Sequence, residues 1–150
     1  MLSSRLVHLI ESNWQELAAR LSRSIKSHPD MEVLAKCSDA DLRDWSQEIL
    51  ENLGYLLTAN RDQEVARRFE VLGKLRFEEN VPLHEAVLRF HLLRGTIAGF
   101  VREQAYPSTG LQLYAQEELE ERMAAFFDAC VYRIVRGYES AMRRASRLAS

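Results

Sequence analysis

The chain has 150 residues, of which 47% are hydrophobic and 28% are charged, a balance that excludes a wholly disordered protein. Its formal net charge of −2 gives no overall attraction to nucleic acid. Glycine and proline are scarce, at 6 and 3 residues, and arginine, leucine, glutamate and alanine are abundant, which favours helix over strand. We therefore expect residues 1–150 to form a single all-α domain.

The two cysteines, Cys37 and Cys130, lie far apart in the sequence and form no CxxC pair. A secreted domain of this size more often has several disulfides, so a reduced, cytoplasmic location is expected. The N-terminal residues lack the apolar run and cleavage site of a signal peptide, and no segment approaches the roughly 18 apolar residues of a membrane span. The sequence thus predicts no contact with a membrane.

Apolar residues recur every three or four positions between residues 4 and 27, which predicts a first helix from Ser4 to Ser27. Pro29 stops this helix, because proline disfavours helical geometry in the residue before it. Residues 31–37 are expected to form a short turn that packs onto the bundle.

Ser38 and Asp41 form a capping-box pattern that predicts the start of a second helix. That helix is expected to fade near residues 58–60. Its apolar face contains Leu42, Trp45, Ile49, Leu53 and Leu56.

A third helix is predicted over Asp62–Glu79, and a fourth has Pro82 in its first turn and reaches about Ala105. Residues 106–110 are the clearest break, and a long last helix follows over Leu111–Arg147. Its apolar stripe steps by three or four positions, which indicates packing in a bundle rather than an ideal coiled coil. The stripe consists of Leu119, Met123, Phe127, Cys130, Ile134, Tyr138, Ala141, Ala145 and Leu148.

These elements predict one bundle of five to six helices with a long C-terminal helix, for which globin-like crossings are one arrangement. Gly95 and Gly99 form a GxxxG pattern, a smooth patch that another helix can approach. We interpret this patch as an internal helix crossing in preference to a subunit contact.

Catalytic patterns are missing from the sequence: there is no HExxH, GxSxG, P-loop, GxGxxG or Glu-x-x-His pair. The sequence therefore predicts no enzyme, no catalytic residue, no metal site and no bound cofactor.

His84 and His91 are the residues that carry the alternative function, a haem- or small-molecule-binding globin-like sensor. They lie two turns apart on one helical face, about 10 Å, and a histidine that faces an apolar cavity can ligate haem iron. Two histidines at that spacing cannot chelate one metal ion. Surface positions are the simpler interpretation.

Glu64 with Arg68, and Glu85 with Arg89, are each spaced four residues apart, which we interpret as solvated helix faces. The last helix has a basic run, which is expected near a helix C-terminus and predicts no nucleic-acid binding. The run consists of Arg133, Arg136, Arg143, Arg144 and Arg147.

Several segments together carry a family resemblance. They are Leu9–Trp14 (LIESNW), Ile49–Gly54 (ILENLG), Leu72–Glu85 (LGKLRFEENVPLHE), Phe126–Asp128 (FFD) and Val135–Glu139 (VRGYE). Over nearly the whole chain, they resemble the N-terminal domain of RsbRD-type RsbT co-antagonists. The resemblance implies a globin-like helical sensor of the stressosome type that generally lacks haem, dimerises and precedes a STAS domain or another output domain. Because this sequence ends at Ser150, we expect a standalone module or one that acts in trans.

The same resemblance gives a structural role to Gly73, Arg76, Glu79 and Pro82. It implies that Gly73 removes a side chain where the third helix crosses a neighbour. Arg76 and Glu79 are then expected to form hydrogen bonds around the turn that precedes Pro82.

The sequence thus predicts a non-enzymatic sensory or regulatory domain, a homodimer that relays a signal through a small shift of its last helix. A STAS-domain protein or a kinase is the expected signalling partner. The predicted partner or dimer contact lies on the last helix, at Met123, Phe127, Cys130, Ile134, Tyr138 and Ala141.

Overall fold

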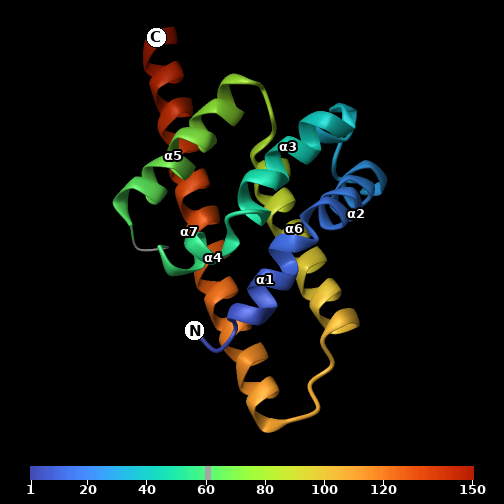
Figure 1. Cartoon of the computed structure of the whole chain (residues 1–150). Helices are drawn as coiled ribbons and strands as arrows, with labels where there is room; N and C mark the ends of the chain where they lie inside the picture. The colour runs from blue at the N-terminus through green and yellow to red at the C-terminus, as the bar shows by residue number, and fades with distance from the viewer. Residues whose placement is uncertain (60–61) are drawn as a thin grey trace.

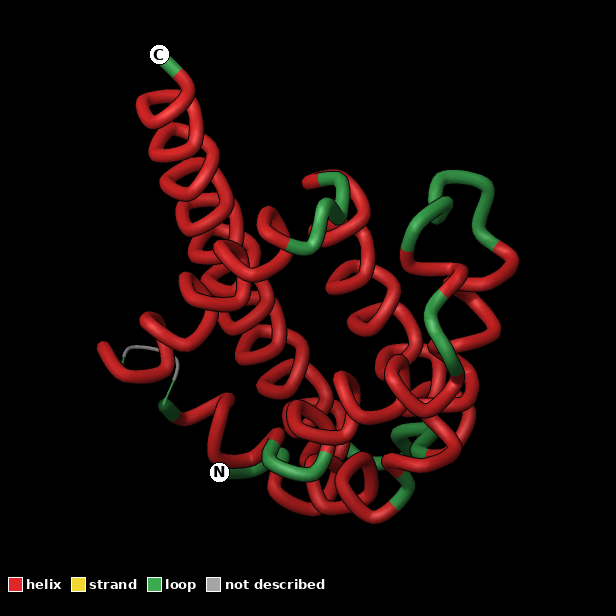
Figure 2. The backbone as a smooth tube through the Cα atoms, turned by 90° about the horizontal axis from the view of Figure 1, so that it is seen from above, coloured by secondary structure: helices red, strands yellow, loops and turns green. Residues whose placement is uncertain are grey.

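In the computed structural model the chain is described over residues 1–59 and 62–150, and the regular structure in these ranges is entirely helical, as predicted (Figures 1 and 2). None of these helices has both the length and the apolar composition that a membrane span requires. The elements are α1 (Ser4–Ser12), α2 (Trp14–Ser27), the 3-10 turn η1 (Leu34–Lys36), α3 (Asp39–Leu50), α4 (Leu53–Thr58), α5 (Gln63–Glu78), α6 (Leu83–Gln104) and α7 (Gly110–Ala149).

Two of the predicted helices are each divided near an asparagine, so the described ranges contain seven α-helices instead of five or six. Asn13 separates α1 from α2, and its Nδ2 donates a 2.8 Å hydrogen bond to the Leu9 carbonyl oxygen. Asn52 precedes α4, and its Nδ2 donates at 2.8 Å to the Glu48 carbonyl oxygen. An asparagine side chain competes with the backbone for helix hydrogen bonds, so the helix ends although the apolar stripe continues. The predicted end near residues 58–60 falls partly outside the described residues.

Other predicted boundaries are confirmed. The Ser38 Oγ accepts a 3.1 Å hydrogen bond from the Asp41 N–H, as the capping-box pattern predicts. After α5, Asn80 has a left-handed φ of 60°, and the Val81 N–H donates to the Arg76 carbonyl oxygen at 3.0 Å. This Schellman-type ending stops α5 and turns the chain toward α6.

The core lies where α6 meets the helices around it, and α6 contacts α1, α2, α5 and α7. Phe90 of α6 is fully buried, and its ring lies edge to face with Trp45 of α3 at a centroid distance of 5.0 Å. Phe69 of α5 and Phe127 of α7 lie edge to face with Phe90 at 6.0 and 6.4 Å. Such T-shaped pairs add directional contacts to the burial of apolar surface, so aromatic rings join four helices.

The crossing of α5 and α7 is the most extensive contact between two helices in the described ranges. A Cβ built on Gly73 would overlap the carbonyl group of Ile134, at 2.9 Å from the carbonyl carbon. One built on Gly137 would lie 2.8 Å from the carbonyl carbon of Glu70. Each glycine thus leaves room for the other helix's backbone, which no side chain would permit.

Ion pairs stand beside this crossing. The Glu70 Oε1 atom accepts a 2.8 Å hydrogen bond from Arg133, and it lies 3.6 Å from the Nε of Arg136. The first part of the basic run is therefore used within the chain, between α7 and α5.

Gly95 and Gly99 do not mark an internal crossing, which corrects our interpretation of the GxxxG pattern. Among the described residues, a Cβ on Gly95 would meet no atom within 4 Å, and one on Gly99 would meet only Arg102, at 4.0 Å. The reason is that α6 packs against its neighbours through a different face, which contains the buried residues Phe90 and Ile97. The smooth patch stays open within one chain.

Replacing Gly137 by alanine is expected to destabilise the fold by about 1–3 kcal/mol, because α5 and α7 must separate to admit a methyl group against backbone. Urea unfolding followed by circular dichroism measures the change. The matched control is Gly95→Ala in α6, which should stabilise by about 0.5–1 kcal/mol because alanine is the better helix former. Equal effects of the two substitutions would contradict the role given to the crossing.

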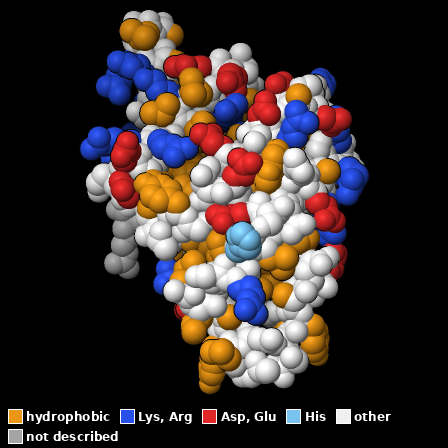
Figure 3. Space-filling view, in the orientation of Figure 1, with side chains coloured by type: hydrophobic (Ala, Val, Ile, Leu, Met, Phe, Trp, Pro, Cys, Tyr) orange, Lys and Arg blue, Asp and Glu red, His pale blue; other side chains and the backbone are white. Residues whose placement is uncertain are grey.

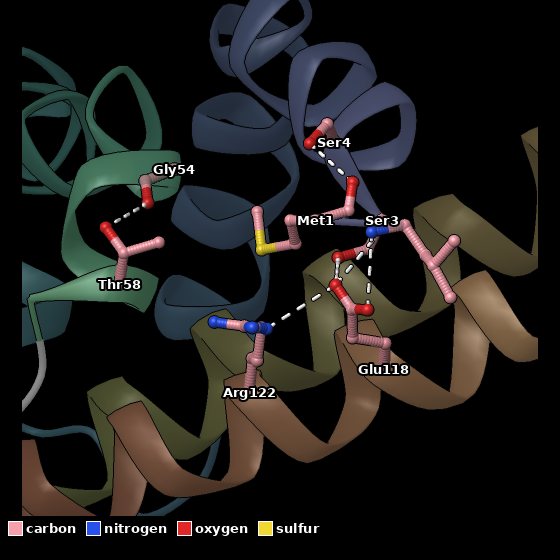
Figure 4. Close-up of polar contacts among 8 residues, drawn as sticks. Met1, Ser3, Ser4, Gly54, Thr58, Glu118 and Arg122 are labelled. Carbon is pink, nitrogen blue, oxygen red and sulfur yellow. Dashed lines mark hydrogen bonds and ion pairs between the residues drawn. The ribbon is translucent and has the colours of Figure 1, made fainter.

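The N-terminal residues are fastened to α7 by Glu118 (Figure 4). Its carboxylate accepts a 2.9 Å hydrogen bond from the Ser3 Oγ and 3.3 Å hydrogen bonds from the N–H groups of Ser3 and Leu2. The Nε of Arg122 lies 3.4 Å away. Partial removal of water works to raise the pKa of Glu118, but the hydrogen bonds from Ser3 and Leu2, with the charge of Arg122, lower that pKa below its ordinary value.

Because the pKa of Glu118 is lower in the folded chain than in the unfolded chain, its contribution to stability is complete above the ordinary value of 4.5. The contribution is lost as the pH falls through the folded value. Between about pH 6 and about pH 3 the wild-type chain should therefore lose more stability than Glu118→Gln, which cannot titrate there. Urea unfolding across this range tests the expectation, and parallel curves for the two chains would overturn it.

Candidate functional site

The C-terminal part of α7 projects beyond the other helices (Figures 1 and 2). Every residue from Met142 to Ser150 is exposed. The side chains of Met142 and Leu148 are apolar, with 47% and 82% of their surface exposed. Basic side chains gather at the end of the molecule from which α7 projects (Figure 3), and Arg143, Arg144 and Arg147 belong to this segment. We call residues 142–150 the projecting end of α7.

The residues predicted to contact a partner lie N-terminal to the projecting end. Five of the six are buried in the chain's own core, and Tyr138 is half-buried. In this conformation a second chain would meet the projecting end before it met that stripe. Contact through the stripe itself stays a prediction. The six residues are Met123, Phe127, Cys130, Ile134, Tyr138 and Ala141.

The motif residues of the α5–α6 turn lie close to one another. Arg76 and Glu79 form an ion pair at 2.5 Å within the last turn of α5, and Pro82 directly precedes α6. The Tyr138 hydroxyl donates a 2.8 Å hydrogen bond to the carbonyl oxygen of Val81. The turn is therefore fastened to α7 one residue beyond the Gly137 crossing.

Glu85 is buried, with 1% of its surface exposed, which corrects the interpretation of Glu85 and Arg89 as a solvated pair. Its Oε1 accepts hydrogen bonds from the N–H groups of Val33 at 3.0 Å and Leu34 at 2.9 Å. These N–H groups begin η1 and would otherwise lack acceptors. The carboxylate thus fixes the α2–α3 connection onto α6.

Arg89 is also buried, with 4% of its surface exposed. Its guanidinium carbon lies 4.0 Å from the centre of the Trp45 ring, a stacked cation–π geometry. Among the described residues its Nε has no hydrogen-bond partner. Burial lowers the pKa of Arg89 to about 9, and repulsion from Arg76 acts in the same direction, against a weaker opposing effect of the negative charge of Glu79.

The other predicted pair, Glu64 and Arg68, is exposed, but Arg68 does not pair with Glu64. It forms a 3.1 Å ion pair with Glu48 of α3 instead. Such an exposed pair contributes little to stability.

The two histidines considered as haem ligands are both exposed. His84 Nε2 lies 3.2 Å from the carbonyl oxygen of Asp30. Within the described ranges, no group of three or more His, Cys, Asp or Glu residues is arranged to hold a metal ion. Burial raises the pKa of the Cys130 thiol, so this cysteine is not an activated nucleophile.

Glu85 and Arg89 are the residues that sequence analysis missed. The i, i+4 spacing fits a solvated pair as well as it fits two buried charges with separate partners. One signal was present: Phe90, Leu93 and Ile97 continue the same face of the helix. Charges that begin such an apolar face are candidates for burial.

Comparisons of the chain with protein-family models, with curated proteins and with solved structures give no match. The resemblance to RsbRD-type domains rests on its segments alone.

Removing the Glu85 carboxylate is expected to loosen η1. Glu85→Ala leaves the buried Leu34 N–H and the part-buried Val33 N–H without their acceptor, so we expect a loss of about 2–3 kcal/mol in the free energy of unfolding. Hydrogen exchange at the Val33 and Leu34 amides should accelerate. Glu103→Ala is the control on the same helix, because its exposed pair with Arg20 contributes at most about 1 kcal/mol. Unchanged exchange in Glu85→Ala would contradict the assignment.

Proposed function

We propose that this chain is a non-enzymatic sensory or regulatory helical domain that dimerises and relays a signal through α7. The observation that carries the proposal is the projecting end of α7, which leaves the bundle as an exposed helix with apolar side chains. Short helices without tertiary packing are marginal in water. A second chain packed against Met142 and Leu148 would supply the missing contacts.

The rest of α7 suits a relay. The helix begins near the N-terminal residues held by Glu118, passes the backbone crossing at Gly137, and continues into the projecting end. Packed helices shift in small rigid movements instead of bending continuously. A displacement of α7 at the crossing would therefore be transmitted along the helix to the projecting end with little decrease in its size.

The resemblance to RsbRD-type domains supports a sensory or regulatory function and suggests which kind of protein receives the signal. A STAS-domain protein or an associated kinase is the proposed downstream partner. The basic residues of the projecting end favour an acidic surface on that partner, because complementary charges speed association.

Sedimentation velocity between about 1 and 100 µM tests the dimer, in the range where weak homodimers dissociate. The wild-type chain should sediment increasingly as a dimer over this range. Met142→Glu combined with Leu148→Glu should weaken the dimer at least about tenfold, because two charges would be buried in the contact.

The control is Leu113→Glu, near the other end of α7, whose 48% exposure matches the 47% of Met142. It should leave dimerisation unchanged. A monomer at every concentration, or equal weakening by the control and the double variant, would refute dimerisation through the projecting end.

A further inference from the structure

The Nε of the Arg89 guanidinium has no hydrogen-bond partner among the described residues. No hydrogen bond or ion pair to it is found among residues 1–59 and 62–150, and its Nε is buried. An arginine presents five N–H donors in a planar fork, and it stays charged at neutral pH. The Trp45 ring covers one face of the guanidinium, and the Nε at its edge has no partner among the described residues. A buried charge without a hydrogen-bonding partner is costly.

A second cation, Arg76, adds to the positive charge near Arg89. Arg76 of α5 is close enough to Arg89 to act on its charge, and the Nε of Arg76 is also buried without a partner. The Nη1 of Arg76 donates a hydrogen bond to the carboxylate of Glu79, which neutralises the charge of Arg76. Glu79 is thus paired with Arg76, and Arg89 has no ion pair among the described residues.

We propose that Arg89 and Arg76 form a binding site for a small oxyanion, a carboxylate or phosphate, between the C-terminal turn of α5, α6 and α3. Carboxylates and phosphates match the planar fork of arginine with two parallel hydrogen bonds. Trp45 provides an apolar wall on one face of the Arg89 guanidinium. The proposal does not depend on dimerisation or on α7.

Glu79 is exposed, and its carboxylate forms an ion pair with Arg76. An entering anion therefore competes with Glu79 for Arg76, while Arg89 has no competitor to release. Removing the Glu79 charge should strengthen binding.

Trp45 provides the readout, because its ring is stacked on the guanidinium that binds the anion. In a Trp14→Phe background Trp45 is the only tryptophan. Sodium acetate or sodium phosphate, titrated at constant ionic strength with sodium chloride, should change its fluorescence in a saturable way. The thermal midpoint should rise by about 2–4 °C once the anion exceeds its dissociation constant about tenfold.

Four variants decide the outcome. Arg89→Gln should abolish the response, and Arg89→Lys, which keeps the charge without the fork, should weaken it at least several-fold. Glu79→Gln should tighten binding several-fold, and Arg94→Gln on the same helix should respond as the parent does. Equal responses in Arg89→Gln and the parent would overturn the proposal. So would a response confined to Glu79→Gln, since Glu79 would then be the resident anion.

Discussion

The contact of backbone against backbone at Gly73 and Gly137 is the constraint on which the rest of the bundle depends. Each glycine leaves the space that a carbonyl group of the other helix occupies, so neither helix can rotate or slide relative to the other without a clash. That contact sets the path of α7, which is 40 residues long and borders much of the core. The aromatic cluster around Phe90 then fills the space that the crossing leaves between α5, α6 and α7.

The two buried charges of α6 have different solutions to the same physical problem. Glu85 is satisfied by backbone N–H groups, which are the natural partners of a carboxylate at the start of a helical turn. Arg89, one turn later, is stacked on the Trp45 ring, and its Nε has no acceptor among the described residues. The first charge therefore stabilises the fold as it stands. The second is tolerated by the fold, and the proposed oxyanion would supply the acceptor for it.

Periodicity was sufficient for the helices but not for the contacts between them. The apolar stripes predicted the class of fold and the ends of α5 and α7 to within a few residues, because burial of one helical face is encoded locally. The breaks at Asn13 and Asn52 interrupt no stripe, so the pattern could not reveal them. Gly95 and Gly99 have the better-known spacing, yet the close crossing is at Gly73 and Gly137, of which the family resemblance implied Gly73 alone. Which glycine meets another helix depends on residues far away in the chain.

The position of the α5–α6 turn gives the proposed anion site a mechanical connection to α7. Arg76 is one turn beyond Gly73, and Tyr138 adjoins Gly137 and donates to the Val81 carbonyl oxygen. A ligand shifts an equilibrium only by the difference in its affinity for two arrangements. An anion that draws Arg76 away from Glu79 would change the last turn of α5, so the bound and the free chain would differ in this turn. Since α5 and α7 meet through rigid backbone, that difference would be expressed as a movement of α7 rather than absorbed by side chains.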